Sequence, residues 1–533
     1  MDARVPLAKE ILDRTPSEVL RLLSELFDRL EKLEAENAAL KTRIERLETE
    51  NRDLKARLKL NSSNSSKPPS SDPPGNQPKR KPPEKPSGRS RGGQPGHAKN
   101  ERPLVPPEEV NEFVPCKPSH CQGCGAPLKG DDPDFVRRQV AEIPSIKPDV
   151  TEYQVHTLTC PGCGACTTGA MPAEAPRGGF GPRLAALVSL LSGAYRLGKR
   201  PIQQLLHDVC GLSISIGMIC KLQQQTAEVL TPTYNELCAD IRLHHVNVDE
   251  TGWRGPASPD SPATATPDGE PPAASDPAAV APPATDETPT TTAKKTKKKK
   301  SWLWVVVAPM ITVFRIASFR SRAVVKSLLG EAFAYVTTCD RWSAYRYLKR
   351  VQWCWAHLRR DFQAMIDRGG PSQAIGEALL EHSDALFHWW HRVRDGTLKR
   401  KTFQRHVGTM SVVFRRDLER GIACGCAKTA ATCRDLLQHE EWLWTFVWHE
   451  GIEPTNNKAE RTVRHAVMWR KTSSGTDSPG GSRFVERILS VVATCRQQGR
   501  NALDFLTECH RQALTGGVLP SLLPQPASAR AAA

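Results

Sequence analysis

The sequence predicts an α/β fold for the central part of the chain, and three observations support this prediction. Four short apolar runs, rich in Val, Ile, Trp and Thr, lie between residues 244 and 339 and predict strands. The segment S-R-A-V-V-K-S-L-L-G, between the third and fourth runs, has helical spacing. The first and fourth runs each lead to an acid, Asp249 and Asp340. Three strands, a helix and a further strand ending in an acid follow one another in the ribonuclease-H-like order.

Composition indicates the class of partner. The 533 residues allow two to four domains, and 74 Lys and Arg against 58 Asp and Glu give a net charge of +16. Together with a pI of about 9.2, this charge favours a polyanion, with nucleic acid as the leading candidate. No stretch approaches the roughly 18 to 20 apolar residues of a membrane span, and the first residues lack the apolar core of a signal peptide. We therefore expect a cytoplasmic protein with no membrane partner.

Residues 17–60 predict a parallel coiled coil, or leucine zipper. The first seam position holds Leu23, Leu30, Asn37, Ile44, Asn51 and Leu58, and the second holds Leu26, Leu33, Leu40, Leu47 and Leu54. The flanking charges are opposite in sign across an in-register homodimer, and the two seam asparagines disfavour other registers. We therefore expect a homodimer. The alternative is an amphipathic helix folded back on its own domain.

Residues 61–110 predict a basic, Pro/Ser-rich linker. The segment contains too few apolar residues to offset the entropy of ordering its backbone. Between Lys67 and Arg102, nine Lys or Arg oppose three acids, a balance suited to contact with a phosphate backbone. The alternative is a merely solvated linker, because charge without a scaffold reads no sequence.

Residues 111–175 predict a zinc-binding ribbon. Two C-x-x-C-G knuckles place Cys121 with Cys124 and Cys160 with Cys163, which gives four thiolates for one structural Zn²⁺. V-R-R-Q-V-A-E-I-P and V-T-E-Y-Q-V-H-T-L-T alternate as strands, so we expect an enlarged hairpin between the knuckles. Sixteen cysteines in a reducing compartment favour metal ligands and buried thiols over disulfides. A redox role for either knuckle is the alternative.

Residues 180–240 predict a helical region. Apolar residues recur at helical spacing, and P-I-Q-Q-L-L-H-D-V-C-G-L-S-I-S-I-G-M-I resembles helix, turn, helix. Such a unit can place its second helix in a DNA groove, although short helical pairs are more often plain packing.

Residues 241–515 predict the catalytic domain, followed by a disordered tail at 516–533. The insertion 256–300 is rich in Pro, Ala and Thr and predicts a disordered excursion from a hairpin. The lysine run at its end could contact DNA. The alternative is that these lysines stay solvated and protect the following apolar strand from aggregation. A second insertion, at about 360–450, predicts helices with an aromatic core. Cys354 and His357 lie one turn apart, and a buried structural contact is favoured over metal binding because only two ligands are visible.

Three carboxylates form the candidate catalytic site. Asp249 and Asp340 close apolar strands, where an unpaired carboxylate is costly to desolvate. Glu460 lies on the first turns of a helix that Thr455 or Asn456 can cap. Two Mg²⁺ ions about 3.5 to 4 Å apart, with Mn²⁺ as an alternative metal, match this oxygen-only donor set. Glu250 lies on the opposite strand face and is expected to be non-catalytic.

The motifs together resemble a known family. N-S-S-N-S-S-K-P-P-S-S-D, R-G-G-Q-P-G-H, the two C-x-x-C-G knuckles, V-D-E-T-G-W, C-W-A-H-L-R-R-D-F and T-N-N-K-A-E-R-T-V-R resemble the TnpC-type DDE transposases of the bacterial insertion sequence 66 family. The resemblance implies a ribonuclease-H-like catalytic domain with Asp249, Asp340 and Glu460 as its triad. It also implies action on terminal inverted repeats, helper proteins encoded by the same element, and a nucleoid-associated protein when bound to DNA. The long insertion after W-R-G-P and the segment T-T-C-D-R-W depart from the usual pattern.

The reaction that this resemblance implies is cleavage of the transposon ends by an activated water, followed by attack of the freed 3'-hydroxyl on target DNA. A group of cations is expected to hold phosphates at the same site: Lys458, Arg461, Arg464, Arg470 and Lys471. Two alternatives remain. One is a zinc-containing coiled-coil DNA-binding regulator without catalysis, and the other is a different ribonuclease-H-like nuclease, such as a junction resolvase, which cuts without joining.

Overall fold

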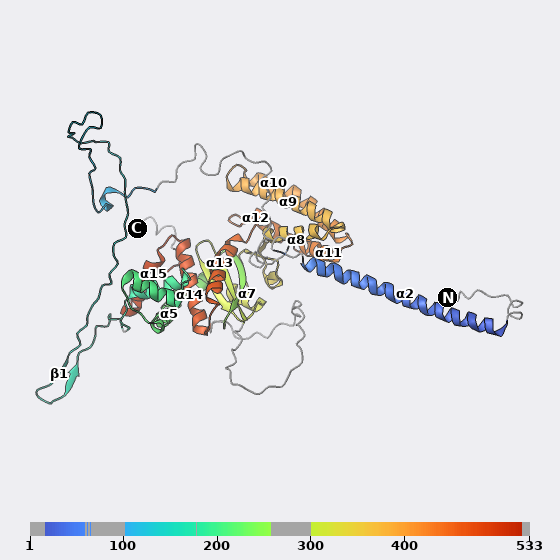
Figure 1. Ribbon diagram of the computed structural model, residues 1–533, viewed down its shortest axis with the longest axis horizontal. Helices are drawn as coiled ribbons and strands as arrows, with labels where there is room; N and C mark the ends of the chain where they lie inside the picture. Colours follow the sequence, from blue (N-terminus) through green and yellow to red (C-terminus); the bar gives the residue numbers. More distant parts are fainter. Residues whose placement is uncertain are drawn as a thin grey trace. The chain divides into compact units, whose positions relative to one another are not determined.

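Figure 1 presents the computed structural model, which describes residues 16–58, 61, 64, 102–176, 178–256 and 300–524. The predicted insertion and most of the predicted linker lie outside the described residues. The chain divides into two compact units. The first comprises Met1–Pro78, Thr338–Ser343 and Arg350–Asn456, and the second comprises Lys79–Thr337, Ala344–Lys349 and Asn457–Ala533.

In the first unit, the predicted zipper forms one continuous helix, α2 (Ser17–Leu58), drawn in blue in Figure 1. The leucines of the second seam position are exposed to solvent, as at Leu26 (61%), Leu33 (55%) and Leu40 (55%). Exposed leucines at heptad spacing need a partner surface to be buried. The predicted helix is therefore confirmed, whereas its pairing with a second copy stays a prediction.

The remaining helices of the first unit form the predicted helical insertion. They are α8 (Trp355–Arg368), α9 (Pro371–Arg394), α10 (Arg400–Ile422), α11 (Ala427–Gln438) and α12 (Glu441–Trp448). The aromatic residues form its core, since the ring of Trp355 lies 5.1 Å from Trp444 and 5.7 Å from Phe414, centroid to centroid. The prediction of aromatic stripes as core is confirmed.

The start of the predicted linker is fastened to this unit. Asn64 is only 6% exposed, and its side-chain amide donates to the Asp367 carboxylate at 2.7 Å. Asn64, which lies in the predicted linker, is therefore held by the folded unit, and the linker itself stays a prediction because most of it lies outside the described residues. Composition correctly indicated few apolar residues, but a buried amide can be satisfied by a distant carboxylate that sequence cannot indicate.

In the second unit, residues 102–176 contain little regular structure. A 3-10 turn, η2, spans Pro107–Glu109, and strands β1 (Thr157–Thr159) and β2 (Cys166–Thr168) pair around the second knuckle. The predicted strand at V-R-R-Q-V-A-E-I-P is not formed. Its apolar side chains lack packing partners, as the 97% exposure of Val140 and 79% of Ile143 show. Alternation alone does not make a strand without a surface to cover.

Four helices follow, α3 (Pro182–Gly193), α4 (Lys199–Cys210), α5 (Ile216–Val229) and α6 (Thr231–Asp240). Gly211, in the left-handed region at φ 65°, ends α4, and Ser215 caps α5 by accepting from the Met218 N–H at 3.1 Å. Ile202, Leu206 and Ile219 share one buried core. The predicted helix, turn, helix is confirmed as a structure, and its contact with DNA stays a prediction.

The sheet holds five strands in the order β5-β4-β3-β6-β7. They are β3 (Val246–Arg254), β4 (Lys300–Val307), β5 (Thr312–Ala317), β6 (Thr337–Cys339) and β7 (Val351–Trp353). Strands β3, β4 and β5 are antiparallel, and α7 (Arg322–Leu329) precedes β6. The predicted order of three strands, a helix and a further strand is confirmed. A 3-10 turn, η4 (Ser343–Tyr347), separates β6 from β7.

One boundary in the sheet differs from the prediction. Asp249 was expected to close its strand, but β3 continues to Arg254, and Asp249 pairs with Val305 in the middle of the ladder. The residues after Asp249 are mostly polar, so the sequence pattern does not predict a strand there. The strand continues because these residues pair with β4. The predicted insertion after Pro256 still leaves from the tip of a hairpin, because Arg254 pairs with Lys300.

Three helices complete the second unit, α13 (Asn457–Ser473), α14 (Pro479–Gln497) and α15 (Ala502–Thr515). Helix α14 covers the edge strand β5 and satisfies its amides: Glu486, Ser490 and Thr494 accept from the N–H groups of Ile316, Phe314 and Thr312. Side chains four residues apart on a helix lie on one face. This row protects an edge that is otherwise open to pairing with another strand.

The chain beyond α15 is partly packed. Leu522 is fully buried, and its carbonyl oxygen accepts from the Gln498 side chain at 2.7 Å. The prediction of a disordered tail from residue 516 is therefore wrong at Leu522. A single buried leucine gives no sequence signal of its burial. Across the described part of the chain, no helix is long and apolar enough to cross a membrane.

Candidate functional site

The two acids Asp249 and Glu250 are adjacent in β3 but have different surroundings. The Glu250 side chain is 4% exposed, and it accepts from Arg320 at 2.7 Å and from the Tyr345 hydroxyl at 2.8 Å. Consecutive side chains of a strand point to opposite faces, so Asp249 lies on the other face. Both partners hold Glu250 within the fold, and its expected lack of a catalytic role stays a prediction.

Helix α13, which carries Glu460, packs against β3 and β4 within the second unit. At its start, the Lys458 ammonium donates to the carbonyl oxygen of Ala308 at 3.3 Å. Ala308 follows Val307, which pairs with Asn247. Near its end, the Arg470 guanidinium donates to the carbonyl oxygen of Gly252.

These two contacts fix the direction of the helix. Lys458 and Arg470 are twelve residues apart, or about 18 Å along a helix. The strand positions that they mark, Asn247 and Gly252, are five residues apart, or about 17 Å along a strand. The agreement means that α13 runs alongside β3 in the same direction. Glu460, one half-turn after Lys458, therefore belongs to the end of the helix that accompanies the first half of β3.

The turn after α13 holds the end of β3. The Thr476 N–H donates to the Arg254 carbonyl at 2.9 Å, and the Trp253 indole N–H donates to the Thr476 hydroxyl at 3.0 Å. Gly475 has a φ of 89°, and a Cβ there would lie 1.9 Å from the Arg254 oxygen. Only glycine fits this approach. The strand and the helix that carry two of the three acids are thus fastened at both ends.

Asp340 follows β6 directly, and its carboxylate accepts from the Trp342 N–H at 3.1 Å. The segment that enters β6 lies beside the start of β3, since the Val246 N–H donates to the Val336 carbonyl at 3.0 Å. The division between the two units falls after Thr337, so Asp249 and Glu460 belong to the second unit and Asp340 to the first. The meeting of all three carboxylates at one site stays a prediction.

Cys354 is fully buried. It precedes α8, and its sulfur accepts from the Asn456 N–H at 3.1 Å, in the first unit. Its own N–H donates to the Cys339 carbonyl at 2.9 Å. Cys354 therefore joins the end of β6 to the residue that precedes α13.

The five predicted DNA-contacting cations differ in their surroundings. Arg464 and Lys471 are exposed, and Arg461 is exposed with its Nε bonded only to its own helix, at the Asn457 carbonyl. Arg470 is half-buried against β3, and burial, followed by the charge of Arg254, lowers its pKa. Its position is therefore explained by the fold, and a role in DNA contact is not needed to account for it.

A cavity of about 320 Å³ beside Arg461 gathers further cations. It is lined by Arg461, His465 and Arg496, among other residues of α13, α14, α3 and β5. Burial, and then the charges of Arg496 and Arg196, lower the pKa of His465. Sequence reasoning missed Arg496, because nothing in its own segment marks it. Arg461 and His465, one helical turn apart, were a detectable signal.

The two cysteine knuckles have the same backbone geometry. The Gly125 N–H donates to the Cys121 carbonyl at 2.9 Å and the Gly164 N–H to the Cys160 carbonyl at 2.8 Å. Both glycines have positive φ, 73° and 71°. Backbone donors from Cys124 and Gly123 lower the pKa of the Cys121 thiol. Such N–H donors stabilise a thiolate, the form that binds zinc.

The cysteine thiolates of the two knuckles are suitable zinc ligands, but the four sulfur atoms do not lie together in the structure. In the described part of the chain, no three of the sulfurs of Cys121, Cys124, Cys160 and Cys163 lie within 4.8 Å of one another. A single tetrahedral site requires all four to converge. Coordination by these four residues therefore stays a prediction.

Comparisons with known proteins place these features in a family. Residues 283–483 match the family described as Transposase IS66 family, residues 118–164 match the zinc-finger binding domain of transposase IS66, and residues 18–103 match a family of unknown function (DUF6444). The first match contains Asp340 and Glu460, and the second contains all four knuckle cysteines.

A curated relative also matches. It is described as an uncharacterized protein, y4qI, from Sinorhizobium fredii, and it is 27% identical over 240 residues, which cover 39% of this chain and 43% of the relative. The chain thus spans less than half the length of the relative that it matches. The zinc-finger domain and the transposase domain of the IS66 family are thus both matched in this chain, in that order along the sequence.

Proposed function

We propose that this chain is a DNA transposase that cleaves the terminal inverted repeats of an insertion sequence and joins the freed 3'-hydroxyls to target DNA. The proposed catalytic residues are Asp249, Asp340 and Glu460 in a ribonuclease-H-like domain. The family match supports this reaction class. The observation that carries the residue assignment is the fastening of α13 alongside β3, which brings the start of the Glu460 helix to the half of β3 that carries Asp249.

The donor set suits the proposed metals. All three residues offer carboxylate oxygens, which Mg²⁺ and Mn²⁺ prefer over the sulfur and nitrogen ligands typical of zinc. Two bound divalent ions would supply an activated water and would stabilise the leaving oxygen. Asp249, Asp340 and Glu460 would together hold these ions.

The remaining side chains position DNA. Arg461, Arg464 and Lys471 are exposed on α13 and are proposed to hold phosphates of the transposon end, and Lys458 and Arg470 to place α13 against the sheet while adding positive charge. Zinc bound by the two knuckles is proposed to order residues 111–175, and α2 to pair two chains so that each acts on one transposon end. DNA, a second copy of the chain and helper proteins of the same element are the proposed partners of a cytoplasmic enzyme.

The experiment uses a supercoiled plasmid that carries the inverted repeats flanking the coding sequence, with Mg²⁺ and purified full-length protein. Asp249→Asn and Glu460→Gln are expected to abolish end cleavage and strand transfer while binding of end DNA is retained. Glu331→Gln changes an exposed acid (83% exposed) between α7 and β6; it is the matched control and is expected to keep activity.

Other outcomes identify the alternatives. End binding without any cleavage in the wild-type protein would favour a DNA-binding regulator. Cleavage without joining, with a preference for branched DNA, would favour a junction-resolving nuclease. Residual strand transfer in Asp249→Asn would exclude Asp249 from the catalytic residues.

A further inference from the structure

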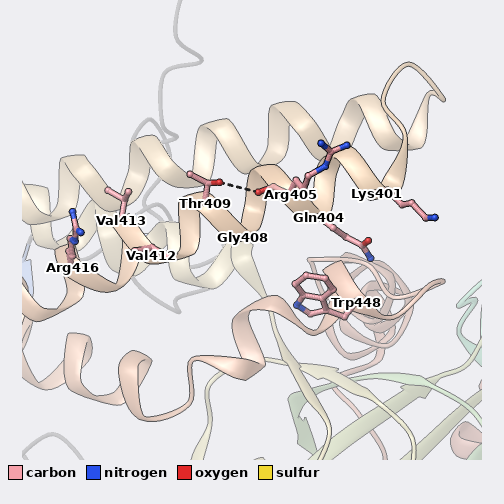
Figure 2. Close-up of a pocket in the computed structure, with 9 residues that line it drawn as sticks. All are labelled: Lys401, Gln404, Arg405, Gly408, Thr409, Val412, Val413, Arg416 and Trp448. Carbon is pink, nitrogen blue, oxygen red and sulfur yellow. Dashed lines mark hydrogen bonds between the residues drawn. The ribbon is translucent and has the colours of Figure 1, made fainter.

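A groove runs along one face of α10 in the helical insertion and ends at Trp448 (Figure 2). It has a volume of about 790 Å³ and lies entirely within the first unit. Lys401, Arg405, Gly408, Val412, Arg416 and Trp448 are among its lining residues, and we call it the α10 groove. None of these residues belongs to the proposed catalytic site.

The α10 groove is positively charged and contains no acid. Its cations, Lys401, Arg405 and Arg416, are exposed and form no ion pair in the described part of the chain. Other cations of the same helix already have partners: Arg415 pairs with Glu440, and Arg420 with Asp417. The groove therefore carries the surplus charge of α10, which suits a polyanionic ligand.

Trp448 gives the α10 groove an aromatic surface. It is 59% exposed, whereas the other tryptophans of α12, Trp442 and Trp444, are each 7% exposed and belong to the core. The Arg400 guanidinium donates to the carbonyls of Phe446 and His449, on either side of Trp448. The backbone that presents this indole is thus held in place, although the ring itself faces solvent.

The middle of the α10 groove is open and apolar. Gly408 has no side chain, and a Cβ added there would meet no atom within 4 Å. Val412 is 55% exposed beside it. Lys401 and Arg405 are about 6 Å apart along the helix, and Arg405 and Arg416 about 16 Å. Cations spaced along one line beside an aromatic and apolar bed are the combination that binds a single nucleic-acid strand.

We propose that the α10 groove binds single-stranded DNA, with Lys401, Arg405 and Arg416 contacting phosphates and Trp448 stacking on a base. This inference rests on the proposed function, since cleavage of a DNA strand produces a free strand end that such a groove can hold. Double-stranded DNA fits the groove less well, because its base faces are already stacked on the neighbouring base pairs and cannot stack on Trp448. The surface would thus extend DNA contact from the catalytic domain to its helical insertion.

The test measures binding of a fluorescein-labelled 20-nucleotide single strand, and of the matching duplex, to full-length zinc-loaded protein by fluorescence anisotropy without Mg²⁺. Trp448→Ala is expected to weaken single-strand binding about tenfold, with Trp448→Phe retaining most of it. Arg405→Glu with Arg416→Glu is expected to weaken binding further and to reduce the slope of log Kd against log salt by about 0.7 for each lost phosphate contact. Duplex binding is expected to change less.

The matched controls are Arg434→Glu, an exposed cation on α11, and Phe319→Ala, an aromatic residue that is 54% exposed in the second unit. Both are expected to bind as the wild type. Unchanged single-strand affinity and salt slope in the groove variants would overturn the proposal, as would equal losses in groove and control variants. A loss confined to duplex, or binding of a protein partner alone, would also overturn it.

The two proposals fail separately. Loss of single-strand binding in the groove variants, with no cleavage by the wild-type protein, would sustain the groove and reject the transposase reaction. If end cleavage depends on Asp249 but the groove variants bind single strands normally, the transposase reaction is sustained and the groove proposal is rejected. Because the substituted side chains are exposed, unchanged thermal unfolding is expected for each variant.

Discussion

Asn64 and Asp367 are joined by a 2.7 Å hydrogen bond across 303 residues of sequence. The Asn64 side chain uses both of its ends, because its oxygen also accepts from the Asn61 N–H at 2.8 Å. The segment that follows the N-terminal helix α2 is thereby fastened to the last turn of α8, in the helical insertion.

Asn64→Ala is expected to release this attachment. A hydrogen bond to a charged group contributes about 1.5 to 3 kcal/mol, so protection of the Asn61 amide from hydrogen exchange should fall at least tenfold. Asp367→Ala should have a similar effect, and the double variant should lose no more than either single variant. Fully additive losses would show that the two side chains do not act together.

Substitution of Glu250 is expected to destabilise the fold more than substitution of its neighbour Asp249. Glu250→Ala removes the acid that pairs with the Arg320 guanidinium and leaves a cavity. Removing one partner of a buried ion pair lowers the free energy of unfolding by about 3 to 5 kcal/mol. Because Arg320 is one-third exposed, we expect the lower part of that range. Asp249→Asn keeps the size and shape of its side chain and should lower the unfolding temperature less. Calorimetric melting of the two variants makes the comparison, and equal melting temperatures would contradict it.

Gly475→Ala is expected to loosen the end of β3. The new Cβ would meet the Arg254 carbonyl at 1.9 Å in a backbone with φ of 89°, so the turn must move. We expect a loss of stability above about 2 kcal/mol. Gly480→Ala is the control, because a Cβ there meets no atom within 4 Å. Urea unfolding followed by tryptophan fluorescence measures both, and a control as unstable as Gly475→Ala would refute the steric explanation.

His510 is expected to destabilise the second unit in acid. Burial lowers its pKa from 6.5 to about 4, and its Nε2 lies 2.9 Å from the Thr226 hydroxyl. The folded state therefore binds this proton at a lower pH than the unfolded state does. The contribution of neutral His510 to stability is fully present above about pH 6.5 and is lost as the pH falls toward 4. The loss is on the order of 3 kcal/mol. Thermal unfolding between pH 8 and 4 should show a shallower pH dependence in His510→Gln. An identical dependence would exclude His510 as its source.

Zinc content tests the two knuckles. One zinc per chain is expected by elemental analysis, and Cys121→Ser or Cys160→Ser should each remove it because three thiolates hold the ion much less tightly than four. Cys166→Ser is the matched control, since this exposed cysteine lies outside both knuckles, and should retain zinc. Retention of zinc in both knuckle variants would reject a shared four-cysteine site.

Much of the fold was predictable where local pattern and packing agree. The strands around Val305 and Phe314 are nearly continuous apolar runs that remain buried, so their sequence already indicates their burial. The heptads of α2 likewise predict a helix without any tertiary contact. By contrast, the strand expected around Val140 is absent, because alternation there has no surface to cover.

The candidate site was predictable in its residue types and only partly in its geometry. Asp249, Asp340 and Glu460 were identifiable because acids beside apolar runs are costly without a cation or donor. That Glu250 is held by Arg320 and Tyr345 could not be read from sequence, because those partners lie 70 and 95 residues away. The same holds for Arg496 beside Arg461.

The sequence by itself determined the order of elements from β3 to β6, the helical character of residues 17–58 and the candidate ligands, because spacing and side-chain chemistry are local properties. The tertiary structure decided where β3 ends, which cations are committed to the fold, and which surfaces stay open. Those features depend on long-range contacts: Arg470 reaches β3 and Asn64 reaches α8 only in the folded chain. The exposure of Trp448 beside unpaired cations was decided in the same way, because burial is a property of neighbours and not of the residue itself.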